Sequence, residues 1–206
     1  DVKNDYLLDD EIDEIDKLKN IKGKVIGYFP TWRDKPGDFF IDLNNYEKLN
    51  AVNEILDKNN SIILMKYHAT SIEKDREILS KFEKFNNFRI LRYDFDLNPI
   101  LKYCDILISD YSGIVTDFLF TNKPIILYIP DLKDYRIHPG LNLDYNNFEI
   151  GHKANNFDEL LDLIKLYHSD EKEFSDKFLV ERKKYFDIFY EKKDLGLEKI
   201  HQIISS

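Results

Sequence analysis

The stretch Asp105-Ile106-Leu107-Ile108-Ser109-Asp110-Tyr111-Ser112-Gly113 decides the predicted fold. An unbroken apolar run changes here to hydroxyl, carboxyl and glycine residues, which is typical of a buried strand that ends in a turn before a helix. Four other runs are similarly rich in Ile, Leu and Val without strict alternation: Lys24–Phe29, Ser61–Met65, Phe88–Leu91 and Pro124–Ile129. Such strands are covered on both faces, as in a parallel sheet.

Helical patterns separate these runs, over residues 46–58, 72–84, 99–103 and 113–121. The alternation predicts an α/β, Rossmann-like parallel sheet with flanking helices. Residues 130–150 are expected to form a long loop, followed by helices over 157–168, 171–190 and 195–204. We therefore expect one domain over residues 1–206, with a linker or entry helix over about 1–22 and a helical C-terminal tail over about 157–206.

Composition excludes several classes of protein. The 206 residues carry a net charge of −9, with 43% hydrophobic and 33% charged residues, so a soluble globular protein without general affinity for nucleic acid is expected. The one cysteine, Cys104, lies in an apolar run, which favours a buried structural thiol over a nucleophile. No apolar run could span a bilayer and no signal peptide is recognisable, so we expect a cytoplasmic location. Because the chain does not begin with Met, we expect an excised piece of a longer protein.

Polar side chains follow the predicted strands where a parallel sheet binds ligands, beyond the strands' carboxyl ends. The turn Ser109–Gly113 is the clearest candidate, because a helix that begins near Gly113 would direct free N–H groups at an anion such as a phosphate. Ser112 can donate its hydroxyl, and Gly113 allows close approach of the backbone. Simple N-capping by Ser112 or Asp110 explains the same residues.

Further candidates follow the first two strands. His68, beside Lys66, could hydrogen-bond a phosphate or act as an acid or base, although a histidine without such a role is the commoner case. Arg33 follows Thr31 and Trp32 and could clamp a phosphate, or could be a surface cation beside a packed aromatic ring.

Several metal and nucleotide motifs are weak or absent. Asp94-Phe95-Asp96 has the D-x-D form that can hold a metal, but Asp96 before Leu97-Asn98-Pro99 is better interpreted as a helix cap. The histidines and the cysteine lack zinc-ligand spacing, and P-loop, dinucleotide and hydrolase-elbow motifs do not occur. The C-terminal helices mix charged and aromatic residues, which favours solvated helices with one core face over a membrane-surface or partner helix.

Taken in order, several motifs resemble the C-terminal half of the CDP-glycerol glycerophosphotransferase family, the teichoic-acid and capsule polymerases. The similarity covers about residues 4–151 and, more weakly, the terminal helices. The motifs are Asn4-Asp5-Tyr6-Leu7-Leu8, Tyr28-Phe29-Pro30-Thr31-Trp32-Arg33-Asp34, Lys66-Tyr67-His68, the 105–113 stretch with Asp117-Phe118, Lys123-Pro124-Ile125-Ile126-Leu127-Tyr128, and Asp131 with Tyr135-Arg136.

The resemblance implies one half of a GT-B glycosyltransferase-type fold, the donor-binding half, with the acceptor domain outside this chain. It implies metal-independent transfer of glycerol phosphate, or a related polyol phosphate, from a CDP-activated donor to a glycan or lipid-linked acceptor, with no cofactor. The isolated domain is then expected to be inactive, and the longer protein to act at the cytoplasmic face of the membrane.

Roles carry over by position. His68 and Arg33 match the family's catalytic histidine and cleft arginine. Ser112 and Gly113 match its diphosphate-binding turn, with Ser109, Asp110, Thr31 and Lys66 around it, and Asp117 matches a position near the ribose. Ala69 stands where the family usually has Pro, and Gly113 where it often has Ser, so the identity of the polyol is open.

Two alternative functions stay open. One is a GT-B glycosyltransferase domain that uses a nucleotide sugar. The other is a non-catalytic nucleotide-binding domain, for which replacing His68 in the full-length protein would leave activity unchanged.

Overall fold

A computed structural model describes residues 9–31, 46–66, 82, 84–92, 94–141 and 143–190. Its centre is a six-stranded sheet in the order β3-β2-β1-β4-β5-β6, with every neighbouring pair parallel. The strands are β1 (Val25–Tyr28), β2 (Ile62–Lys66), β3 (Phe88–Leu91), β4 (Ile106–Ser109), β5 (Ile125–Tyr128) and β6 (His152–Ala154).

The five strands predicted from apolar runs are confirmed. All residues of β1, β4 and β5 are buried, as expected for strands covered on both faces. Leu107 and Ile108 of β4, for example, are 0% and 1% exposed. Burying such side chains contributes roughly 1.5–3 kcal/mol each, so these runs supply much of the driving force for folding.

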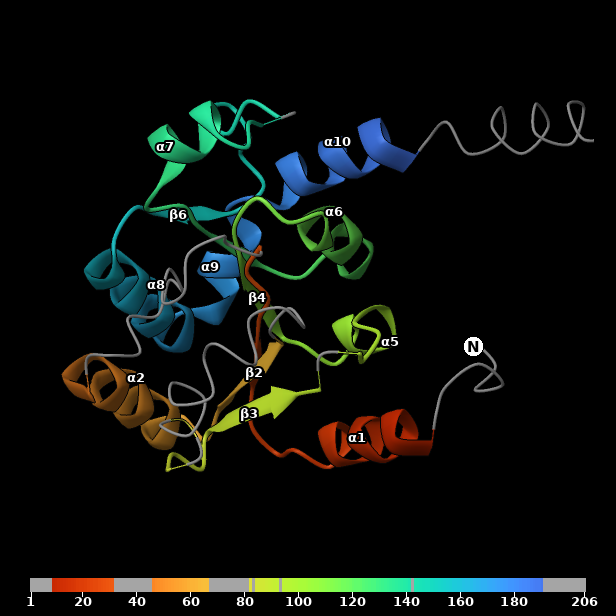
Figure 1. Cartoon of the computed structure of the whole chain (residues 1–206), viewed down its shortest axis with the longest axis vertical. Coiled ribbons are helices and arrows are strands. Elements are labelled where there is room, and N and C mark those ends of the chain that lie inside the picture. Colours follow the sequence, from red (N-terminus) through yellow and green to blue (C-terminus); the bar gives the residue numbers. More distant parts are fainter. Residues whose placement is uncertain are drawn as a thin grey trace, which may run out of the picture.

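Two layers of helices cover the sheet (Figure 1). On one face lie α2 (Tyr46–Lys58), α8 (Phe157–Ser169) and α9 (Glu171–Asp176), which share one hydrophobic core. On the other lie α1 (Asp9–Lys19), α5 (Asn98–Leu101), α6 (Ile114–Phe118) with the 3₁₀ turn η2 (Leu119–Thr121), and α10 (Leu179–Tyr190). The predicted α/β parallel-sheet fold is therefore confirmed.

Sequence reasoning missed two elements and merged two others. Residues 130–150, expected to be loop, contain α7 (Leu132–Ile137), and β6 follows them. The start of β6 comes very close to β5, because a Cβ on Gly151 would lie 2.1 Å from the Ile125 carbonyl oxygen. The predicted helix over 171–190 is broken into α9 and α10 at Lys177–Phe178.

The break lets the C-terminal helices cross the edge of the sheet. Phe174 of α9 packs in the core that contains α8, whereas Phe186 of α10 packs on the opposite core. Between them, His152 of the edge strand β6 stacks on Phe174, with 4.1 Å between ring centroids. This crossing covers a strand edge that would otherwise be available for pairing with another chain.

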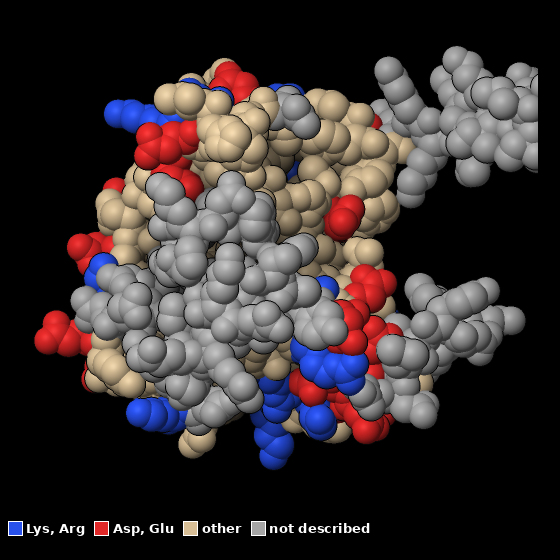
Figure 2. All heavy atoms as spheres, viewed as in Figure 1, with Lys and Arg blue, Asp and Glu red and all other residues tan. Residues whose placement is uncertain are grey.

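Mixed charge surrounds α1. Lys17–Glu14 and Lys19–Asp16 form ion pairs along the helix at 3.2 and 2.7 Å. Figure 2 shows acidic and basic side chains intermingled in this region. In the described part of the chain, no helix is both long and apolar enough to cross a bilayer. Most of the helix predicted over 72–84, and that over 195–204, lie outside the described residues.

Candidate functional site

The order of the strands reverses between β1 and β4, the point at which open α/β sheets bind ligands beyond the strands' carboxyl ends. The described residues beyond those two ends are 29–31 and 110–113. Four of the predicted site residues therefore lie next to one another here, and Ser109 ends β4 directly beneath them.

Side chains tie the two strand ends together, in an arrangement that we call the switch-point clamp (Phe29, Thr31, Ser109 and Asp110). The Ser109 hydroxyl donates to the Phe29 carbonyl at 2.6 Å. Thr31 donates its backbone N–H and its hydroxyl to the same oxygen of Asp110, at 2.8 and 2.6 Å. Ser109 and Asp110 are 1% and 0% exposed. Their predicted contact with a donor stays a prediction.

Above the clamp, the turn is open at Gly113. This residue is exposed, and among the residues that the structure describes no heavy atom lies within 4 Å of a Cβ placed on it. Its φ of −58° is ordinary for any residue, so the backbone conformation does not require glycine here. Glycine instead leaves room for a ligand to approach the backbone closely.

Helix capping accounts for little of this turn. The Ser112 hydroxyl accepts the Ile114 N–H at a long 3.4 Å, and the N-cap residue Gly113 has no side chain to accept a bond. Asp110, the other capping candidate, is bonded to Thr31 instead. N-capping by Ser112 or Asp110 therefore explains these residues less well than the sequence suggested.

Asp117, one turn into α6, contacts α10. Its carboxylate accepts the Tyr190 hydroxyl at 3.2 Å. It also lines a cavity of about 440 Å³ between α5 and η2, together with Asn98, Leu101, Lys102, Phe120, Thr121 and Lys123. The predicted ribose contact of Asp117 stays a prediction.

Lys66 ends β2, where its ammonium group donates to the Phe95 carbonyl. Burial lowers the pKa of Lys66, while the nearby carboxylates of Asp96, Asp94 and Glu11 act in the opposite direction. The predicted phosphate-binding role of Lys66 would require it to keep its charge and turn toward the ligand.

The D-x-D carboxylates have protein partners. Arg92 donates to both oxygens of Asp94, at 3.0 and 2.6 Å. Asp96 accepts the Asn98 N–H at 3.0 Å, but the prediction that it caps the helix is wrong, because the N-cap residue of α5 is Leu97. Among the residues that the structure describes, no group of three or more His, Cys, Asp or Glu residues could hold a metal ion.

Three tyrosines to which the sequence analysis assigned no role lie beside the clamp. Tyr111 stacks on Tyr135 of α7, with ring centroids 4.0 Å apart, and donates its hydroxyl to Asp131 at 2.9 Å. Tyr145 donates to the backbone carbonyl of Asp110 at 2.9 Å, and burial raises its pKa. Tyr111 could have been suspected from its place between Asp110 and Ser112, whereas nothing in the sequence distinguishes Tyr145.

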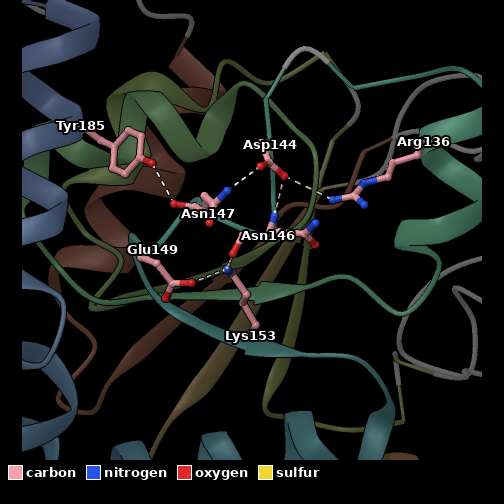
Figure 3. Close-up of polar contacts among 7 residues, drawn as sticks. All are labelled: Arg136, Asp144, Asn146, Asn147, Glu149, Lys153 and Tyr185. Atoms are coloured by element: carbon pink, nitrogen blue, oxygen red, sulfur yellow. Dashed lines mark hydrogen bonds and ion pairs between the residues drawn. The ribbon is translucent and has the colours of Figure 1, made fainter.

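A polar network holds the segment that carries Tyr145 (Figure 3). Asp144 accepts from the Asn146 backbone at 3.1 Å, the Asn147 side chain at 2.7 Å and Arg136 at 3.4 Å. Tyr185 of α10 donates to the Asn147 carbonyl at 2.9 Å. Residues 144–147 are therefore held by Arg136 of α7 and by Tyr185 of α10.

Two predicted catalytic residues, Arg33 and His68, lie outside the described residues. Cys104 is fully buried, and burial raises its pKa to about 12, so the predicted structural thiol is confirmed.

Comparison with known proteins gives a consistent result. The sequence profile of the family described as CDP-glycerol:poly(glycerophosphate) glycerophosphotransferase matches residues 3–193. The teichoic acid ribitol-phosphate polymerase TarL of Staphylococcus aureus is 34% identical over 157 residues, which cover 72% of this chain and 26% of the polymerase. A teichoic acid poly(glycerol phosphate) polymerase of Bacillus spizizenii is 28% identical over 197 residues, covering 85% of this chain and 47% of that protein.

Solved structures share the fold. The wall teichoic acid polymerase TagF superposes with a TM-score of 0.67 at 22% identity, covering 96% of this chain and 48% of TagF. Anabaena HepE in complex with UDP superposes with a TM-score of 0.55 at 10% identity, over 96% of this chain and 53% of HepE. The chain thus has the fold of one half of a GT-B protein.

The chain spans less than half the length of these curated relatives. The family match, by contrast, covers nearly all of it, from the predicted entry segment to the end of the described helices. This chain belongs to the CDP-glycerol:poly(glycerophosphate) glycerophosphotransferase family.

Proposed function

We propose that this chain binds the CDP-activated polyol donor of a transferase that moves polyol phosphate to a cell-wall or capsule polymer. The observation that carries the proposal is the open turn at Gly113, beyond β4 at the switch point, in a chain whose family is defined by such transfer. A solved TagF structure that had been soaked with CDPG shares the fold, with a TM-score of 0.64.

In the proposed reaction the acceptor oxygen attacks the phosphorus that carries the polyol, the bond to the bridging diphosphate oxygen breaks, and CMP leaves. Negative charge develops on the departing phosphate. Backbone N–H groups and the Ser112 hydroxyl can stabilise that charge without reorganising, because the clamp beneath them is already in place.

We assign the positive part of this stabilisation to Arg33, His68 and Lys66, and the ribose contact to Asp117. No metal or other cofactor is included, since these groups supply the charge. The acceptor, a glycan or lipid-linked polymer end, and the general base would come from a further domain. The isolated chain should then bind donor without transferring it, and the longer protein would act at the cytoplasmic face of the membrane.

Calorimetric titration of the chain with CMP, CDP-glycerol and UDP-glucose tests the proposal. We expect CMP and CDP-glycerol to bind and UDP-glucose to bind at least roughly tenfold more weakly, a difference of about 1.4 kcal/mol. Absence of binding by both cytidine compounds would remove the proposal. Preference for UDP-glucose would favour the nucleotide-sugar alternative.

A further inference from the structure

We propose that Asp110 and Thr31 are positioning residues, whose buried bonds hold the Ser112–Gly113 turn in the geometry that binds a diphosphate without touching the diphosphate themselves. The inference rests on the proposed function and deepens it. It reassigns two residues that sequence reasoning had placed among the groups in contact with the ligand.

The chemistry of Asp110 opposes direct contact with a diphosphate. An ionised carboxylate only accepts hydrogen bonds, and a diphosphate also presents only acceptors, so no bond can join them. Their charges repel as well, and the repulsion is strongest in a site with little water. The Asp110 side chain is fully buried, with both donors of Thr31 on one of its oxygens.

The same contacts suit Asp110 for positioning. Its carboxylate is bonded to Thr31 across the β1–β4 boundary, and its backbone carbonyl is bonded to Tyr145. Asp110 is therefore held by side chain and main chain together. Ser112 follows two residues later, so a shift at Asp110 would displace the turn directly.

The other end of the clamp bond fixes the chain just beyond the first strand. Asp110 accepts the main-chain N–H of Thr31, and β1 ends three residues earlier at Tyr28. Thr31 precedes Arg33 by two residues in the sequence, and Arg33 itself lies outside the described residues.

Substitution of Thr31 tests this role. Thr31→Val keeps the shape and the backbone donor but removes the hydroxyl donor, whereas Thr31→Ser keeps both donors. At a temperature where circular dichroism shows all proteins fully folded, we expect Thr31→Val to bind CDP-glycerol roughly 5- to 10-fold more weakly than wild type, as for the loss of one hydrogen bond. Thr31→Ser should restore affinity to within about twofold.

A matched control is Ser61→Ala. The buried Ser61 hydroxyl also makes a local bond, donating to the Asn59 carbonyl at 3.1 Å, but Ser61 directly precedes β2 and so lies at the opposite end of the strands from the switch point. Ser61→Ala should lower the melting temperature without changing the affinity for CDP-glycerol. Equal affinities of folded Thr31→Val and wild type would overturn the inference while leaving the proposed function intact.

A double-variant cycle separates positioning from direct contact. If Asp110 acts through Thr31, Asp110→Asn and Thr31→Val together should weaken CDP-glycerol binding no more than the more damaging single change. If the double variant instead loses CDP-glycerol affinity by the product of the two single fold-losses, Asp110 acts on the donor independently of Thr31, and the inference is overturned. If wild type itself does not bind CDP-glycerol or CMP, the proposed function fails and the inference fails with it.

Discussion

The switch point and the β6 edge bury polar side chains in opposite ways. At the switch point, the buried Asp110 has two donors on one oxygen, and the backbone above it at Gly113 is open. At the β6 edge, His152 and Arg182 are 8% and 2% exposed. Among the described residues, His152 Nε2 and Arg182 Nε and Nη1 have no hydrogen-bond partner.

This difference separates the proposed functional site from a region with a structural role. The pKa of His152 falls to about 4, chiefly through burial and also through the charges of Lys177 and Arg182. Shifted pKa values often mark active sites, but His152 is 8% exposed and its ring packs against Phe174 and Phe178. We therefore base the proposed site on the open turn above the clamp and not on this shifted pKa.

The largest effect is expected for Asp110→Ala. Removing the buried carboxylate breaks the two hydrogen bonds that it accepts from Thr31, which should lower the free energy of unfolding by about 2–4 kcal/mol. Urea denaturation measures this change. A loss below about 1 kcal/mol would mean that the clamp contributes little.

Arg182→Met is the counterpart at the β6 edge. Arg182 keeps one bond, from Nη2 to the Ser175 carbonyl at 2.6 Å, while burial lowers its pKa. Since an apolar replacement removes the desolvation penalty along with that bond, unfolding free energy should change by less than about 1 kcal/mol. A loss equal to that of Asp110→Ala would contradict the contrast between the two regions.

The next effect concerns pH. Because the pKa of folded His152 is depressed to about 4 from 6.5, the unfolded chain binds the proton first as the pH falls. The stability that neutral His152 provides is complete well above pH 6.5 and should decrease by roughly 3 kcal/mol by pH 4. Urea denaturation of wild type and His152→Leu across this pH range isolates the contribution of His152. If the unfolding free energies of the two proteins change in parallel with pH, the prediction is wrong.

A smaller effect is expected for Ser109→Ala, which removes the bond to the Phe29 carbonyl. The free energy of unfolding should fall by about 1 kcal/mol, measurable by thermal or urea denaturation. An unchanged midpoint would show that this part of the clamp adds no stability.

The smallest effect is expected for Tyr190→Phe. Its 3.2 Å bond to Asp117 is partly exposed, so the free energy of unfolding should fall by about 0.5 kcal/mol, measurable by thermal denaturation. A loss above about 1.5 kcal/mol would contradict the small contribution expected of this bond.

The predictable parts of this molecule are those decided by local composition. Runs such as Ile106-Leu107-Ile108 specify buried strands by themselves. The sequence therefore predicted these strands and the edge of the sheet, at their carboxyl ends, where the candidate site residues lie. β6, with only His152-Lys153-Ala154, forms because β5 offers a partner, and no local signal predicts that. The clamp joins residues 79 apart, and the sequence shows that Asp110 ends a strand but not that it points toward Thr31.

The most direct test of the proposed site uses Gly113→Leu. Gly113 has ordinary helical φ and ψ and open space around a Cβ, so the variant should fold with a change in unfolding free energy below about 1 kcal/mol. Its added side chain should nevertheless cover the turn and reduce CDP-glycerol affinity at least roughly tenfold in calorimetric titration. A folded Gly113→Leu variant that binds CDP-glycerol as tightly as wild type would contradict the placement of the diphosphate at this turn.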